Sequence, residues 1–384
     1  MSLPDDLRWV ILDILDCRTS NEASGRRQMR ILFITEHRYL PQYLGGMQTT
    51  ADNLCHGLLN RGHYVSILAS FMRTGFFGWR CTLQRKMLGR SVLKDRKCGY
   101  PVWRSWVPSS EVRYVARREQ PDIIVVMAMA PVRMALAARP TGLPIVMQLH
   151  DTEFECHGGD FSEIRTFPCI SNSHFTADQY RNAFGVESSV IYPIILPSDY
   201  QTTSTREVIT FINPIAVKGL DIAVEIARRC PDLPFEFVEA WPLKPEQRRE
   251  LASKLAGRCN VTLRSAQREM KQIYGKSKIL LAPSIWGEAY GRVVTEAQLS
   301  AIPVIASAKG GLPEAVGPGG LLIDPEGPIE AWVAAIRRLW DDKAYYADLS
   351  SMALKHATRP ELNFDYQVEA WERTFAEVAS RKYS

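Results

Sequence analysis

The chain has 384 residues, of which 46% are hydrophobic and 23% are charged, and its formal net charge is +5. This length favours two domains, the charge is too small to indicate nucleic-acid binding, and the longest apolar run, Ile123–Ala130, is too short to span a bilayer. The eight cysteines are scattered without a Cys-x-x-Cys pair, which is typical of reduced thiols in a cytoplasmic protein.

Residues 1–28 read as an N-terminal extension. Leu7–Leu15 has apolar residues at helical spacing, but acidic residues in and beside it argue against a signal peptide. We therefore expect the first domain to begin at Met29 and to cover residues 29–196.

This domain opens with a strand, a glycine-bearing loop, a helix and a second strand: Arg30–Thr35, Gly45-Gly46, Met47–Asn60 and Tyr64–Ala69. That order is typical of a doubly wound, nucleotide-type domain. A Gly-Gly pair alone is most often only a turn. The first strand is not followed by Gly-x-Gly-x-x-Gly, which argues against an NAD-dependent oxidoreductase.

The segment Phe71–Gly99 carries eight Lys and Arg residues against one acid, Asp95, together with four aromatic residues: Phe71, Phe76, Phe77 and Trp79. Cationic and aromatic residues together suit an interface with anionic lipid head groups. We therefore consider that this cytoplasmic protein binds peripherally to the inner face of the membrane. The alternative is a basic, solvated excursion with one aromatic cluster packed inward.

The rest of the first domain reads as alternating strands and helices: Val102–Val107, Ser110–Arg118, Asp122–Met127, Pro131–Ala138, Pro144–Leu149, Cys169–Asn172 and Ser173–Asn182. His150 follows a strand at the edge where doubly wound sheets bind ligands, although a single histidine is often structural. Together with His150, the chain's nearest approach to a metal cluster consists of Asp151, Glu155, Cys156 and His157. We do not favour a metal site there. Ser173 is a plausible helix N-cap.

Pro197–Arg206 is polar and turn-rich and reads as the linker (197–206) to a second domain at 207–360. The expected elements there are Val208–Ile212, Lys218–Arg229, Phe235–Val238, Pro245–Leu255, Asn260–Leu263, Gln267–Tyr274, Ile279–Ala282, Val293–Leu299, Pro303–Ala306, Leu321–Ile323, Pro328–Trp340 and Lys343–Lys355. Lys218 stands at a helix entrance, where its charge suits a diphosphate. Arg264 follows a strand at the expected ligand edge, although such an arginine is more often solvated.

The most informative stretch is Pro283–Glu296, a strand end, a loop and a helix start. Gly287 and Gly291 let the backbone approach a ligand closely, and the first amides of the helix form an anion site. Glu288 in the loop and Glu296 in the helix place a carboxylate at each end of a bound phosphate group. An ordinary strand–turn–helix with two solvated glutamates is the alternative.

This stretch resembles the E-x7-E pattern of the retaining glycosyltransferase family 4, which has the GT-B fold of two Rossmann-like domains facing across a cleft. The resemblance continues through Ala297, Pro303–Ala306 and Gly310–Glu314, and it is looser in the first domain, where it includes Leu149-His150-Asp151. It also implies that the last helix, Phe364–Ser380 within residues 361–384, crosses back onto the first domain.

The resemblance implies a donor-binding set and a catalytic set. Donor-binding residues would be Gly45, Gly46, Asn213, Lys218, Arg264, Glu288, Ala289, Tyr290, Gly291, Arg292, Val293 and Glu296; catalytic residues would be His150, Lys218 and Glu288. Glu288 would contact the donor sugar, Glu296 the ribose hydroxyls, and the amides from Tyr290 to Val293 the diphosphate.

The chain departs from the family pattern in two places. Asn213 lies in the region where an arginine is usual, and Arg292 stands where an apolar residue is common. Arg292 compensating for the lost charge is one hypothesis.

The resemblance thus predicts transfer of a sugar from a nucleoside-diphosphate sugar to a hydroxyl of a glycan, lipid-linked or small-molecule acceptor. We expect no cofactor and no essential metal, because the chain has no Asp-x-Asp. The alternatives are a GT-B nucleotide-sugar epimerase and a nucleotide-sugar-binding protein with degenerate catalysis, which Asn213 favours.

Overall fold

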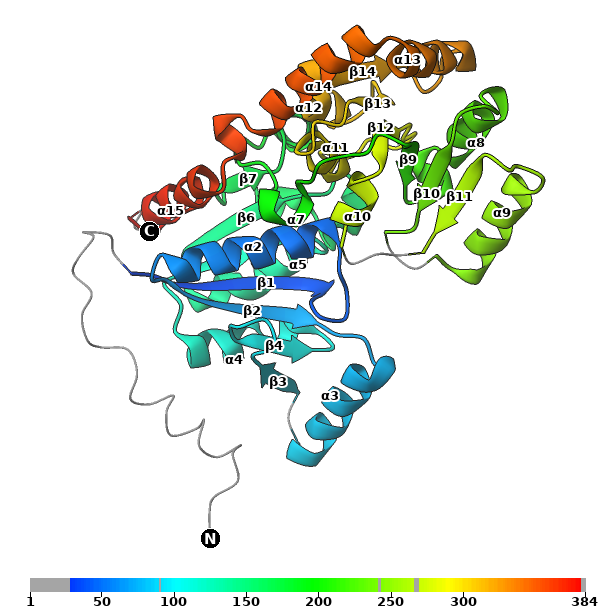
Figure 1. Cartoon of the computed structure of the whole chain (residues 1–384). Helices are drawn as coiled ribbons and strands as arrows, with labels where there is room; N and C mark the ends of the chain where they lie inside the picture. The colour runs from blue at the N-terminus through cyan, green and yellow to red at the C-terminus, as the bar shows by residue number, and fades with distance from the viewer. Residues whose placement is uncertain (1–27, 90, 241–242, 266–268, 381–384) are drawn as a thin grey trace.

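The computed structural model describes residues 28–89, 91–240, 243–265 and 269–380, which form two lobes, each built on one β-sheet (Figure 1). Within these residues the first sheet has eight strands in the order β3-β4-β2-β1-β5-β6-β7-β8, parallel except for the edge strand β3. Their bounds are β1 Arg30–Arg38, β2 Tyr64–Ser70, β3 Val92–Asp95, β4 Val102–Ser105, β5 Ile123–Val126, β6 Ile145–Leu149, β7 Cys169–Ser171 and β8 Ser188–Val190.

The central strands of this sheet are continuous apolar runs because both of their faces are covered by helices. The helices of the first lobe and of the connection after it are α2 Gly46–Asn60, α3 Gly75–Leu88, α4 Pro108–Glu119, α5 Pro131–Ala138, α6 His174–Phe184 and α7 Pro197–Tyr200. Helix α2 packs on one face with Phe33, whereas α4 and α5 pack on the other with Ile34. Ser173 caps α6 by accepting a hydrogen bond from the Thr176 amide, so the predicted N-cap is confirmed.

The second sheet is parallel throughout the described residues, in the order β11-β10-β9-β12-β13-β14. Its strands are β9 Val208–Ile212, β10 Phe235–Val238, β11 Val261–Arg264, β12 Ser277–Ala282, β13 Val304–Ser307 and β14 Gly320–Ile323. Its helices are α8 Leu220–Arg229, α9 Pro245–Leu255, α10 Lys271–Tyr274, α11 Arg292–Gln298, α12 Leu312–Val316, α13 Ile329–Asp341 and α14 Lys343–Ala357. Short 3₁₀ turns, η1 to η6, occur at Arg139–Thr141, Phe154–His157, Phe161–Glu163, Ala216–Lys218, Gly317–Gly319 and Pro360–Leu362.

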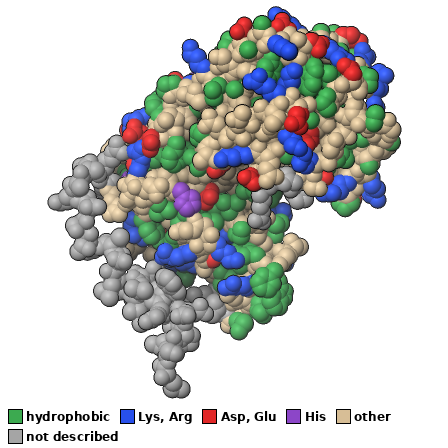
Figure 2. Space-filling view, viewed as in Figure 1, with side chains coloured by type: hydrophobic (Ala, Val, Ile, Leu, Met, Phe, Trp, Pro, Cys, Tyr) green, Lys and Arg blue, Asp and Glu red, His purple; other side chains and the backbone are tan. Residues whose placement is uncertain are grey.

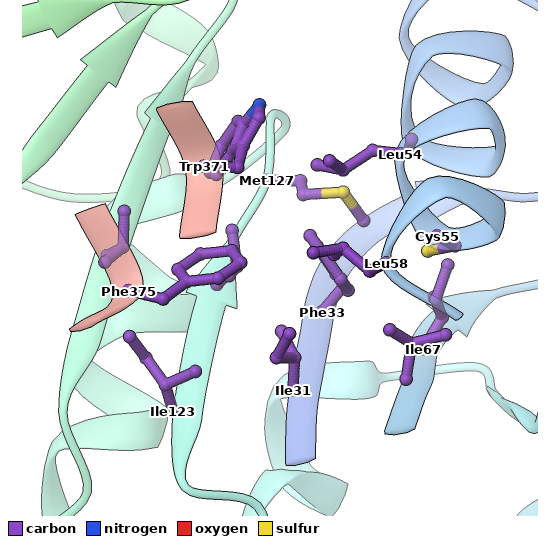
Figure 3. Close-up of a cluster of buried hydrophobic side chains, with 14 of the residues drawn as sticks. Ile31, Phe33, Leu54, Cys55, Leu58, Ile67, Ile123, Met127, Trp371 and Phe375 are labelled. Carbon is purple, nitrogen blue, oxygen red and sulfur yellow. The ribbon is translucent and has the colours of Figure 1, made fainter. Parts of the chain in front are cut away.

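The last helix, α15 (Phe364–Ser380), leaves the second lobe and lies against α2 of the first. Its apolar side chains Trp371 and Phe375 enter the same buried cluster as Ile31 of β1 and Leu58 of α2 (Figure 3). The predicted crossing helix is therefore confirmed, and it shares one core with β1 and α2.

Three segments of the chain need comparison with the sequence-based expectations. The helix expected over Gln267–Tyr274 is confirmed over Lys271–Tyr274 only, and Gln267 and Arg268 lie outside the described residues. The expected linker begins with helix α7 and continues against the second lobe, where the Thr205 amide donates to the Gly275 carbonyl. The basic segment Phe71–Gly99 contains helix α3 and the edge strand β3.

The predicted extension at residues 1–28 lies outside the described residues, apart from Gln28. None of the helices in the described part of the chain combines the length and apolarity needed to cross a membrane.

Candidate functional site between the lobes

The candidate site lies where the carboxyl ends of the parallel strands of both sheets meet, which is the edge at which such sheets bind ligands. The first lobe contributes His150, directly after β6, and the second contributes the loop between β12 and α11. Acidic and basic side chains lie next to one another along the boundary of the two lobes (Figure 2).

Lys218 and Glu288 form an ion pair at this site, with 2.9 Å between Nζ and Oε2. Both side chains are mostly buried, and the ammonium also lies 5.1 Å from the centre of the Trp286 ring. Lys218 belongs to turn η4, and the next residue, Gly219, has a φ of 83°. A Cβ on Gly219 would lie 1.9 Å from the Pro283 carbonyl oxygen, so only glycine lets these two segments meet here.

The loop after Glu288 carries four consecutive amide donors. In the part of the chain that the structure describes, no carbonyl group in a turn, loop or cap accepts a hydrogen bond from the N–H groups of residues 290–293. Gly291 has a φ of 98° and precedes α11, which begins at Arg292, one residue earlier than expected. These amides are therefore available to an anion beside the Lys218–Glu288 pair.

Glu296 lies deeper, and its carboxylate is buried between two side chains. Arg292 Nε lies 3.4 Å from Oε1, and the Tyr274 hydroxyl donates to Oε2 at 3.0 Å. Burial raises the pKa of Glu296, while Arg292 and then Tyr274 act to lower it. The carboxylate thus depends on these partners for its charge and its orientation.

His150 is buried, with its Nδ1 3.4 Å from the Asn172 side-chain amide and its Nε2 without a protein partner among the described residues. Burial, and then the charge of Arg292, lower its pKa to about 4. The imidazole is therefore neutral at physiological pH, and Nε2 can exchange a hydrogen bond with a ligand.

The two lobes also contact each other directly around this site. Ser173 Oγ and Thr176 Oγ1 of the first lobe donate to the Ala289 carbonyl of the second. The Glu314 carboxylate accepts hydrogen bonds from the amide of His174, at the start of α6, and from the hydroxyl of Tyr192.

The side chains of two predicted donor-binding residues have partners within the protein. The Asn213 side-chain carbonyl accepts from the Ala240 amide at 3.0 Å, and Asn213 has a φ of 60°, so it shapes the turn after β9. Arg264 donates to Glu236 at 2.7 Å through Nε. Neither side chain contacts Lys218 or Glu288 among the described residues.

Four residues of the arrangement were missing from the sequence-based prediction: Trp286, Tyr274, Thr50 and Glu314. Trp286 lies in the stretch Pro283–Glu296 and Glu314 in the run Gly310–Glu314, so their places within these two motifs could have identified them. Tyr274 precedes Glu296 by 22 residues and Thr50 is 242 residues from its partner Arg292, which leaves no local signal for either.

Two doubly wound lobes that share a site at their facing edges define the GT-B class. Consistent with this, two family models match consecutive parts of the chain: Glycosyltransferase Family 4 over residues 44–197 and Glycosyl transferases group 1 over residues 199–356. The chain belongs to this family of GT-B glycosyltransferases, as its motifs predicted.

A curated relative, D-inositol 3-phosphate glycosyltransferase from Corynebacterium glutamicum, is 36% identical over 114 residues, 29% of this chain and 25% of the relative. The chain thus spans about a fifth to a quarter of the length of the first curated relatives that it matches. A glycosyltransferase from Rickettsia africae has a similar structure, with a TM-score of 0.73 at 14% identity over 92% of this chain and 99% of that one. HepE from Anabaena, solved with UDP and glucose, gives a TM-score of 0.71 at 19% identity over 91% and 100%.

Proposed function

We propose that this protein is a retaining glycosyltransferase that moves a sugar from a nucleoside-diphosphate sugar to a hydroxyl group of an acceptor. The observation that carries the proposal is the loop after β12, where the Lys218–Glu288 ion pair lies beside the open amides of residues 290–293. A cation and four N–H donors in one turn are what a diphosphate needs.

The chemistry needs little covalent help from the protein. As the glycosidic bond of the donor breaks, negative charge grows on the departing diphosphate, and Lys218 and the loop amides are in place to stabilise it. Glu288 and the free Nε2 of His150 orient the sugar, which is a positioning contribution. The acceptor hydroxyl gives its proton to a departing phosphate oxygen. The charge of the diphosphate is met by protein groups, so we propose that no metal is required.

The donor and acceptor are proposed as classes. HepE was solved with UDP and glucose, which supports a nucleotide-sugar donor for this chain as well. The first lobe is proposed to bind the acceptor, which is a glycan, a lipid-linked saccharide or a small polyol.

The donor proposal is tested by thermal shift with UDP, GDP, ADP and TDP and their sugars, each with EDTA and with magnesium. A ligand at 100 times its dissociation constant stabilises the fold by about 2.7 kcal/mol, so one base should stand out. The shift should be equal in EDTA and should vanish in Glu296→Ala. A protein that responds to none of these ligands would refute the proposal, and a shift that needs magnesium would refute its metal-independent part.

Among the acceptor classes, we propose that a lipid-linked one is favoured by helix α3. Phe76, Trp79, Leu83 and Met87 recur at helical spacing on one side of α3, and all four are exposed, Phe76 by 79% and Met87 by 76%. Hydrophobic side chains gather over this helix in Figure 2.

The charge of α3 points in the same direction. The helix has no acidic residue, and the cations Arg80 and Lys86 are exposed on it. Phe77 instead faces inward and packs against the small core around Cys81. An exposed apolar row flanked by cations suits the surface of an anionic bilayer.

A double variant, Phe76→Ser with Trp79→Ser, is expected to lose at least about tenfold in binding to phosphatidylglycerol-containing vesicles, because each aromatic side chain contributes about 1.5–3 kcal/mol on burial. Co-sedimentation measures the binding, and Met352→Ser on α14, another partly exposed apolar residue, serves as the matched control. Equal sedimentation of the double variant and the control would exclude a membrane role for this face.

A further inference from the structure

Arg292 occupies an unusual position, because its guanidinium contacts both lobes at once. Its NH1 donates to Thr50 Oγ1 of α2 at 2.6 Å and to the Ile194 carbonyl at 2.9 Å. Its NH2 donates to the Tyr200 hydroxyl at 3.3 Å, and its Nε lies 3.4 Å from Glu296 Oε1. All three nitrogens of the group thus have protein partners, and the side chain is only 13% exposed.

The aliphatic part of Arg292 also explains a glycine of the first lobe. A Cβ on Gly46 would lie 2.8 Å from Arg292 Cδ, so the glycine lets the arginine stem pass close to the start of α2. The Arg292 side chain of the second lobe therefore reaches the Gly45-Gly46 turn. An apolar residue at position 292 could fill the same space but could not donate to Thr50, Ile194 or Glu296.

This geometry links the buried carboxylate to the opposite lobe. Glu296 is held on one oxygen by Arg292 and on the other by Tyr274, and Arg292 is held in turn by Thr50 and Ile194. The donors of a planar guanidinium have fixed relative directions. The acceptors bound on one side therefore constrain where the acceptor on the other side can lie.

We propose that Arg292 is a positioning residue for the donor: it orients the Glu296 carboxylate for the ribose hydroxyls and makes that orientation depend on contact with the first lobe. The proposal rests on the proposed function above, and it differs from direct compensation for Asn213. Arg292 acts on the ribose through Glu296, so its loss should affect only ligands that have both hydroxyls.

The test compares UDP with 2′-deoxy-UDP, or GDP with 2′-deoxy-GDP if guanine is the base that stands out. Calorimetric affinities are measured for the wild type, Arg292→Leu, Arg292→Lys and Thr50→Val. A hydrogen bond to a charged group contributes about tenfold or more in affinity. Arg292→Leu should therefore lower the affinity for UDP about tenfold and change the affinity for the deoxy ligand by less than about threefold. Arg292→Lys, which keeps the charge beside Glu296, should recover part of the loss.

Thr50→Val removes one contact with the first lobe and leaves the Arg292–Glu296 pair in place. It should lower the affinity for UDP several-fold and, as in Arg292→Leu, change the affinity for the deoxy ligand much less. An unchanged affinity for UDP would overturn the interlobe part of the inference. Equal losses for UDP and its deoxy form in Arg292→Leu would overturn the inference as a whole and favour a direct diphosphate contact. A wild-type protein that binds neither ligand would instead refute the proposed function, so the two failures are distinguishable.

Discussion

Replacing Lys218 with methionine is expected to lower kcat for sugar transfer by about 100- to 1000-fold, the usual effect of removing one preorganised group that stabilises developing charge. The ammonium is mostly buried beside Glu288, where water screens it weakly. Methionine keeps the length of the side chain but removes the charge. The measurement is steady-state transfer with the donor that the ligand panel identifies, together with a melting curve to show that the variant is folded.

The matched control is Lys254→Met on α9, which removes the same charge from an exposed pair with Asp221. Exposed pairs contribute about 0–1 kcal/mol, so this variant should keep near wild-type kcat. If Lys218→Met also retained full kcat, another group would have to stabilise the leaving diphosphate, and the assignment of Lys218 would fall.

Truncation of Trp371 to alanine is expected to destabilise the protein by about 3–5 kcal/mol, as for other large-to-small changes at buried aromatic positions. Trp371 is 1% exposed and packs beside Phe375, with 5.5 Å between the ring centres. Both side chains belong to the core cluster of the first lobe, although α15 follows the second lobe in the chain (Figure 3). The loss is measured from urea unfolding curves.

Tyr366→Ala provides the control on the same helix, because its side chain is 45% exposed. It should change the free energy of unfolding by less than about 1 kcal/mol. Equal unfolding midpoints for the two variants would mean that α15 contributes little to the core.

Local signals in the sequence predicted most of the fold. Continuous apolar runs such as Ile31–Ile34 and Ile123–Val126 are buried strands because both faces of a parallel sheet are covered. The helix entrance at Ser173 was predictable because a hydroxyl before a helix satisfies one of its free amides. The helix expected over Gln267–Tyr274 is present only over Lys271–Tyr274 among its described residues, and helices of so few residues depend on packing.

The partners of the site residues had no such signal. The sequence placed Arg292 at the helix start, but whether it faces a diphosphate or the first lobe depends on how the lobes meet. Asn213 likewise stood in a region that usually carries a donor-binding charge, whereas its contact with Ala240 gives it a role in the turn. On α3, Phe76 and Phe77 are adjacent in the sequence, and only the packing of Phe77 against the cluster around Cys81 shows that Phe76 is the outward side chain.

The sequence by itself thus determined the order of most strands and helices and the GT-B family, and it predicted the residues of the candidate site, because periodicity, caps and motif spacing act over a few neighbouring residues. Only the tertiary structure decided that Lys218 pairs with Glu288 and that Arg292 joins Glu296 to Thr50. Lys218 and Glu288 are 70 positions apart in the sequence, and Thr50 and Arg292 are 242 positions apart. Their contacts form only after both sheets have formed and α15 has packed against the first lobe.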